Sequence, residues 1–424
     1  GEGMTMTFER TASPIPPIDV ARPELFAEDR WQEPFRELRA KAPIQYVPDS
    51  KFGPYWSVTK FDDIMAVDTN HKVFSSDISH GGISIVDDLG KDALPMFIAM
   101  DPPKHDHQRK VVAPIVGPGN LAKMEGLIRT RAASILDELP VGETFDWVDR
   151  VSKELTTQML ATLFDFPFED RHLLTYWSDV ATALPAPGEL VETEEEQIAV
   201  LNDCLAYFVR LWNERVNAEP GTDLISMLAH GESTRHMTPK EYLGNIVLLI
   251  VGGNDTTRNT MTGSVLALNQ NPDQYQKLRD HPELIPSMVS ETIRWQTPLA
   301  HMRRTATCDT ELGGKRIAKG DKVVMWYVSG NRDETAIENP NSYIIDRDRP
   351  RHHISFGFGI HRCVGNRLAE MQLRIVWEEI LKRYPTIEVV GEPIRPATPF
   401  VKGYQSLPVR IPASKSLPAR ASSG

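Results

Sequence analysis

The sequence predicts a mainly α-helical fold, in which one long central helix crosses a large helical domain and a small β-rich region lies near the N-terminus. A capping box at residues 238–241, with Pro239 at the first helical position, starts a helical pattern that continues to Asn271. At about 1.5 Å per residue this helix is about 50 Å long, enough to cross a domain. Apolar residues at three-and-four spacing predict further helices over residues 121–139 and 148–164.

Composition bounds the class of protein. The chain has 424 residues, of which 41% are hydrophobic and 25% charged, as in ordinary globular proteins. We expect one domain over residues 22–411, with a flexible arm at 1–21 and a flexible tail at 412–424. The net charge of −11 argues against nucleic acid as a partner. With no apolar run of membrane-spanning length, no signal peptide and only three cysteines, we expect a cytoplasmic protein.

The N-terminal part supplies the β-rich region. Residues 45–47 and 55–59 predict two short strands joined by a turn, and residues 61–68 predict a short helix. Residues 78–100 then form a long segment without regular periodicity, and such long loops are usually functional or disordered.

The next helix is predicted to open at Asp101-Pro102-Pro103, because proline suits the first helical turn. His105 and Arg109 follow four residues apart and therefore share one face of that helix. Two donors on one face can hold a carboxylate. The alternative is a solvated pair.

The middle of the long central helix breaks the usual rules for a buried helix. Residues 246–251 are apolar all round and must be buried, yet the poor helix formers GGNDTT follow directly at residues 252–257. Such a break indicates function rather than packing. The two glycines clear space beside the helix, Thr256 can donate a proton into it, and Asp255 can carry protons inward from solvent. The alternative is an ordinary polar kink, and we expect Thr257 to be structural.

One cysteine, Cys363, lies in the glycine-rich stretch FGFGIHRCVG at residues 356–365, directly before a helical pattern from Asn366 to Tyr384. The N-terminal end of a helix favours the thiolate. A lone cysteine is a poor site for zinc or an iron–sulfur cluster, since both need several ligands. One thiolate beside closely approaching backbone suits a haem iron with a single axial cysteine ligand. The alternative is a buried, inert cysteine.

The cysteine stretch resembles the ligand loop of cytochromes P450, whose pattern is Phe-x-x-Gly-x-x-x-Cys-x-Gly. Phe356, Gly359, Cys363 and Gly365 match it in register, and residues 252–257 match the family's oxygen-activation motif. The resemblance implies the P450 fold and a haem b cofactor bound through Cys363.

The resemblance also implies which other residues contact the cofactor or support its site. Around the cysteine, Phe356, Gly357 and Gly365 would lie against the haem. Four residues would hold the haem propionates: His105, Arg109, Arg304 and His361. Arg303 is the alternative to Arg304. Glu291 and Arg294 would form a buried network with Arg347. Ile337 and Tyr343 stand where phenylalanine is usual in the family, so we expect packing changes there.

The activity that the resemblance implies is a monooxygenase that inserts one oxygen atom from O2 into an unactivated C–H bond, with Asp255 and Thr256 delivering protons. The chain shows no flavin or nicotinamide motif. Electrons would therefore come from a separate 2Fe–2S ferredoxin and its NADH-dependent reductase.

The substrate expectation rests on longer stretches, including residues 251–260, 294–299 and 361–375, which resemble terminal alkane and fatty-acid hydroxylases. They imply terminal (omega) hydroxylation of medium-chain linear alkanes or fatty acids. The candidate pocket residues are apolar or small: Val251, Gly252, Leu299, Met302 and Phe400. One alternative is a P450 for a bulkier terpenoid or steroid. Another is a non-catalytic haem-binding sensor, against which the proton donors Asp255 and Thr256 argue.

Overall fold

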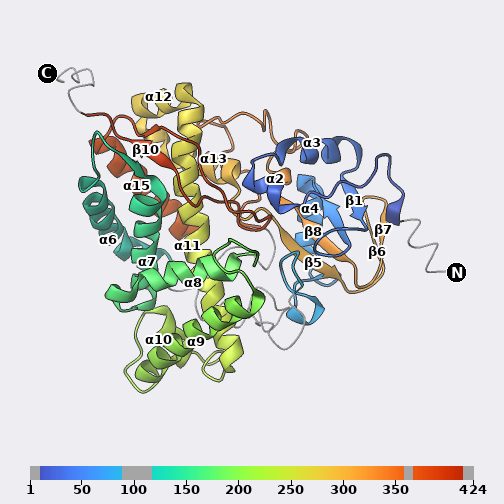
Figure 1. Cartoon of the computed structure of the whole chain (residues 1–424), viewed down its shortest axis with the longest axis horizontal. Helices are drawn as coiled ribbons and strands as arrows, with labels where there is room; N and C mark the ends of the chain where they lie inside the picture. Colours follow the sequence, from blue (N-terminus) through green and yellow to red (C-terminus); the bar gives the residue numbers. More distant parts are fainter. Residues whose placement is uncertain (1–9, 88–116, 358–365, 414–424) are drawn as a thin grey trace.

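A computed structural model describes residues 10–87, 117–357 and 366–413. Most of the long helices lie on one side of the molecule, and the β-rich part lies on the other, together with the helices of residues 23–69 (Figure 1). This arrangement confirms the predicted mainly α fold class. Among the described residues, no helix is long and apolar enough to cross a membrane.

The main sheet has five strands in the order β1-β2-β8-β5-β3. Its strands are β1 (Ile44–Val47), β2 (Tyr55–Val58), β3 (Phe74–Ser75), β5 (Met302–Ala306) and β8 (Lys322–Met325). The two predicted N-terminal strands are present, but they are only the edge of this sheet. β2 pairs in parallel with β8, with Trp56 opposite Val323, so strands from much later in the chain complete the region.

Two smaller sheets lie elsewhere: β4 (Thr144–Asp146) with β9 (Glu388–Val389) and β10 (Pro408–Arg410), and the hairpin of β6 (Thr310–Leu312) and β7 (Lys315–Ile317). The helices of the described chain are α2 (Pro23–Ala27), α3 (Gln32–Lys41), α4 (Phe61–Thr69), α6 (Pro118–Asp137), α7 (Lys153–Phe164), α8 (His172–Thr182), α9 (Glu194–Val216), α10 (Leu224–His230), α11 (Pro239–Gln270), α12 (Pro272–Asp280), α13 (Ile285–Gln296), α14 (Tyr327–Gly330) and α15 (Asn366–Arg383). A short π-helical turn, Val148–Ser152, precedes α7.

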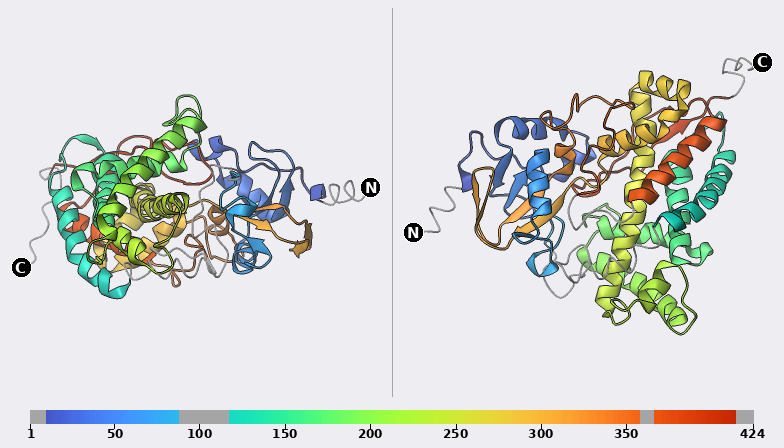
Figure 2. Two further views of the ribbon diagram at one scale, coloured as in Figure 1. Left: turned by 90° about the horizontal axis from the view of Figure 1, so that it is seen from below. Right: turned by 180° about the vertical axis from the view of Figure 1, so that it is seen from behind.

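Helix α11 is the central element, with helices α7, α8, α9, α13 and α15 packed around it. Seen nearly along its axis, it lies inside a ring of other helices (Figure 2). Its N-terminus has the predicted capping box, in which the Glu241 N–H donates to Thr238 Oγ1 over 3.2 Å. The capping box sets the N-terminus of α11, and the packed helices around it hold the polar residues in the middle of α11 in place.

Close packing against α13 depends on Gly263. A Cβ atom at this position would lie 2.3 Å from Gln296 Oε1, so a larger residue would displace the Gln296 side chain. Gln296 also accepts a hydrogen bond from the Tyr404 hydroxyl over 2.7 Å. The crossing therefore ties the C-terminal segment to α11 and α13.

Candidate active site

One face of α11 is more open than the rest of the helix. Leu248, Gly252 and Thr256 are four residues apart and only partly buried, whereas the neighbouring Asn254 and Asp255 are buried. A Cβ atom built on Gly252 meets no atom of the described chain within 4 Å. The sequence-predicted motif thus lies along a stripe of the central helix that the described residues leave partly uncovered.

Asp255 points away from that stripe, into a polar cluster between α11 and α8. Its Oδ1 accepts hydrogen bonds from Ser178 Oγ over 3.1 Å and from Asn254 Nδ2 over 3.2 Å. Arg258 Nη2 lies 3.3 Å from the same oxygen. The other oxygen, Oδ2, is buried and has no hydrogen-bond partner among the described residues. A buried carboxylate oxygen in this state is able to accept a proton.

Burial and two neighbouring charged groups set the pKa of Asp255. Burial raises its pKa, Arg258 lowers it and Asp179 raises it again, so that the pKa is about 6. Arg258 Nη2 also donates to Asp179 Oδ1 over 2.8 Å, and the Asp179 side chain is 27% exposed. Asp179, Arg258 and Asp255 therefore form a line of charged groups from solvent to the buried acid.

The two adjacent arginines of β5 lie in different environments, because neighbouring side chains of a strand point to opposite faces. Arg303 donates to the carbonyls of Gly81 and His80 and pairs with Asp87. Arg304 is buried and donates to Asp68 Oδ1 over 2.9 Å. Arg303 thus anchors the segment 80–87, while Arg304 faces α4.

The start of the cysteine stretch lies beside the Arg304 pair. Gly357 has a φ of +74°, and a Cβ atom there would lie 3.3 Å from Asp68 Oδ2 and 3.4 Å from the Tyr327 hydroxyl. Both the backbone conformation and the crowding favour glycine. Phe356 is partly buried against the helical core. Five predicted cofactor contacts lie outside the described residues: His105, Arg109, His361, Cys363 and Gly365.

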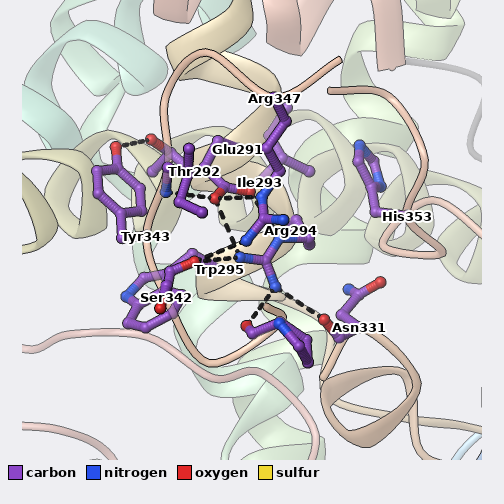
Figure 3. A network of polar contacts seen from close by, with 12 residues as sticks. Glu291, Thr292, Ile293, Arg294, Trp295, Asn331, Ser342, Tyr343, Arg347 and His353 are labelled. Atoms are coloured by element: carbon purple, nitrogen blue, oxygen red, sulfur yellow. Dashed lines mark hydrogen bonds and ion pairs between the residues drawn. The ribbon is translucent and has the colours of Figure 1, made fainter. Parts of the chain in front are cut away.

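A buried network joins α13 to the segment after α14 (Figure 3). Glu291 Oε1 accepts from Arg294 Nε over 2.6 Å, and its Oε2 accepts from Arg294 Nη2 over 3.1 Å and from Arg347 Nε over 2.8 Å. Arg294 Nη1 donates to the carbonyls of Asn331 and Pro340 over 2.9 and 2.8 Å. Tyr343, for which we expected only altered packing, also forms a 2.6 Å hydrogen bond with Thr292.

The predicted pocket residues come from three separate segments. Met302 and the partly buried Leu299 belong to one apolar cluster, which also takes in Leu248 and Leu249 of α11. The segment carrying Phe400 runs beside Leu299, since the Ala300 N–H donates to the Phe400 carbonyl over 2.8 Å and Leu299 pairs with Val401. These contacts bring one apolar wall toward the open face of α11, where Val251 and Gly252 are partly buried.

His301, which sequence reasoning missed, joins two parts of this wall. Its Nε2 accepts from the Ile85 N–H over 3.0 Å, its Nδ1 donates to the Pro399 carbonyl over 2.6 Å, and its ring lies 5.2 Å from that of Phe400. Burial lowers its pKa to about 4, so the ring is neutral and keeps both bonds at neutral pH. The sequence signals only a lone histidine, which is usually uninformative.

Comparisons with known proteins agree on one family. The family model described as Cytochrome P450 matches residues 50–403. The solved structure of Cytochrome P450-153 from Novosphingobium aromaticivorans is 51% identical, with a TM-score of 0.87, and the match covers 93% of this chain and 99% of that one. Linalool 8-monooxygenase of Pseudomonas putida is 36% identical, over 92% of this chain and 98% of its own length. Methyl-branched lipid omega-hydroxylase of Mycobacterium tuberculosis is 31% identical, over 94% and 96%.

Proposed function

The chain belongs to the cytochrome P450 family of haem monooxygenases, and from this premise we propose that it hydroxylates the terminal carbon of medium-chain linear alkanes or fatty acids. The observation that carries the proposal is the open stripe of α11, Leu248, Gly252 and Thr256, beside an apolar wall that includes Leu299 and Met302. The omega-hydroxylase relative and the resemblance to terminal alkane and fatty-acid hydroxylases support it.

The family's cofactor is haem b. The open side of Gly252 and the donors of Arg304 that no described residue accepts suit a bulky group that carries carboxylates. Cys363 would bind the iron through its thiolate, and Phe356, Gly357 and Gly365 would contact the haem. The propionates would be held by His105, Arg109, Arg304 and His361. When bound, a haem with one thiolate ligand activates dioxygen and inserts one oxygen atom into a C–H bond.

The part of the chemistry that belongs to the chain is proton delivery. Asp255 has a pKa of about 6, which suits an acid that gains and loses a proton near neutral pH. Thr256, the next residue, lies on the open face and would pass the proton into the space beside Gly252. Asp179, at the solvent end of the charged line, would exchange protons with water.

The apolar wall has two tasks in this proposal. It excludes water from the space beside α11, and it holds a flexible chain so that one end meets the reacting centre. Leu299 and Phe400 approach from the two paired segments that His301 ties together. None of the predicted pocket residues in the wall is charged. This suits a substrate without polar groups near its reacting end.

Electrons would arrive from separate proteins. We propose a 2Fe–2S ferredoxin as the direct donor, reduced by an NADH-dependent reductase, because the sequence contains no flavin or nicotinamide motif.

Thr256→Ala is expected to uncouple electron use from product. The variant should consume NADH at a rate similar to that of the parent protein, but most of the electrons should reduce O2 to hydrogen peroxide. The product formed per NADH should fall by about 100-fold, the low end of a general-acid contribution. Product, NADH and peroxide would be measured together. Thr257→Ala is the matched control, because Thr257 is buried and lies off the open face. Unchanged coupling in Thr256→Ala would refute the proposed role.

The substrate proposal is tested by a product panel with a surrogate ferredoxin and reductase. Octane, dodecanoic acid, linalool and a steroid would be supplied separately, and products identified by mass spectrometry. We expect hydroxylated products from octane or dodecanoic acid at the highest product yield per NADH. Hydroxylation of the steroid ring, with octane and dodecanoic acid untouched, would contradict the proposal.

A second candidate is hydroxylation of a bulkier terpenoid, which the 36% identity to linalool 8-monooxygenase favours. The same panel separates the two, since coupled turnover of linalool alone would support the second. A haem sensor without turnover is less consistent with this chain, because a sensor needs no buried acid of the kind found at Asp255.

A further inference from the structure

We propose that Asp68 is a positioning residue for the cofactor, and that it acts by holding Arg304 in the orientation that receives a haem carboxylate. The inference rests on the proposed role of Arg304 in the haem site. It concerns a residue of helix α4 that no motif of the sequence singles out.

Asp68 and Arg304 form a fully buried ion pair. The side chains are each 1% exposed, and Arg304 Nη2 donates to Asp68 Oδ1 over 2.9 Å. The Tyr327 hydroxyl donates to Asp68 Oδ2 over 3.4 Å. Elements α4, β5 and α14 thus converge on one carboxylate, directly beside Gly357 at the start of the cysteine stretch.

Burying a carboxylate and a guanidinium costs several kcal/mol per ion, so a buried pair is weak evidence for stability by itself. A guanidinium has five N–H donors. Among the residues that the structure describes, Asp68 and the Arg303 carbonyl accept from two of them, over 2.9 Å each. The remaining donors leave Arg304 able to bind a second carboxylate, while Asp68 fixes the plane of the guanidinium.

Asp68 also adds a negative charge close to the site. With Arg304 it forms a neutral pair, so a haem carboxylate would meet an oriented donor rather than a mobile cation. Replacing Asp68 with alanine would leave Arg304 buried without its partner and free to change rotamer. Replacing it with asparagine would keep the shape and one acceptor oxygen but remove the charge.

The test is the rate of haem loss from the holoprotein to an excess of apomyoglobin, together with the haem reduction potential. Asp68→Ala should lose haem about tenfold faster than the parent protein, in keeping with the loss of a charge-assisted hydrogen bond. Asp68→Asn should retain haem better than Asp68→Ala and shift the potential in the positive direction, because a nearby negative charge is gone. Asp62→Ala, an exposed position on the same helix, is the matched control and should change neither.

A double-mutant cycle shows whether Asp68 acts through Arg304. In an Arg304→Gln background, Asp68→Ala should not accelerate haem loss further, whereas a merely structural role would add its full effect. Parent-like haem loss in Asp68→Ala, or full additivity in the cycle, would overturn the inference. If Asp68→Ala does not fold, the isosteric Asp68→Asn carries the test through its potential. A parent protein that binds no haem would instead refute the proposed function.

Discussion

Asp255→Asn is expected to remove nearly all coupled hydroxylation while making the folded protein more stable at neutral pH. The activity loss should be about 100-fold, the low end of what a positioned acid contributes. The stability gain arises because ionising a buried carboxylate is costly. Its pKa is about 6 in the folded protein against 3.8 in the unfolded chain, so the charged form costs about 3 kcal/mol above pH 6.

Asp255 contributes less to the stability of the folded protein as the pH rises. Between pH 3.8 and about 6 the folded state binds more protons at Asp255 than the unfolded state, so its contribution to stability is lost as pH rises through this window. Urea unfolding at pH 7 should show the gain in Asp255→Asn, and the difference should fade near pH 4. Asp203→Asn, an exposed position on α9, should change neither stability nor coupling. A variant that is both active and no more stable would contradict the account.

Glu291→Gln is expected to destabilise the protein by about 3–5 kcal/mol, the usual effect of breaking a buried charge pair. Glu291 is fully buried and its Oε2 accepts from Arg294, Arg347 and the Ile344 N–H. An amide in its place turns one acceptor into a donor facing other donors. It also leaves two arginine side chains, 1% and 11% exposed, without their carboxylate.

Urea unfolding of the parent and variant proteins measures this loss. Glu283→Gln is the matched control, because its side chain is 71% exposed and it precedes the same helix. The control should change the unfolding free energy by less than about 0.5 kcal/mol. A loss below about 1 kcal/mol in Glu291→Gln would mean that the network contributes little to holding the fold.

Local patterns predicted the elements around the site, because their signals lie within one helix or turn. The capping box and the run of poor helix formers at residues 252–257 sit on a single helix, α11, and the structure places both there. Leu248, Gly252 and Thr256 are four residues apart and therefore share one face of a helix. Leu248 could have been predicted as a pocket residue from this spacing alone.

The partners of these residues could not be predicted in the same way. Ser178 lies 77 positions from the Asp255 that it contacts, and Asp68 lies 236 positions from Arg304. No periodicity links such pairs, since only the packing of α8 on α11 and of α4 on β5 creates them. The alternation of β5 also separated Arg303 from Arg304, which the sequence left as alternatives because it did not define that strand.

The most direct test of the account is the identity of the product formed from octane under oxygen-18 gas, with a surrogate ferredoxin and reductase. Oxygen activation beside Thr256 and a wall that presents the chain end together predict 1-octanol carrying one oxygen-18 atom. Octanols hydroxylated at internal carbons would contradict the proposed terminal selectivity. An unlabelled alcohol, or no oxidised product from octane or dodecanoic acid, would contradict the proposed oxygenation of linear chains.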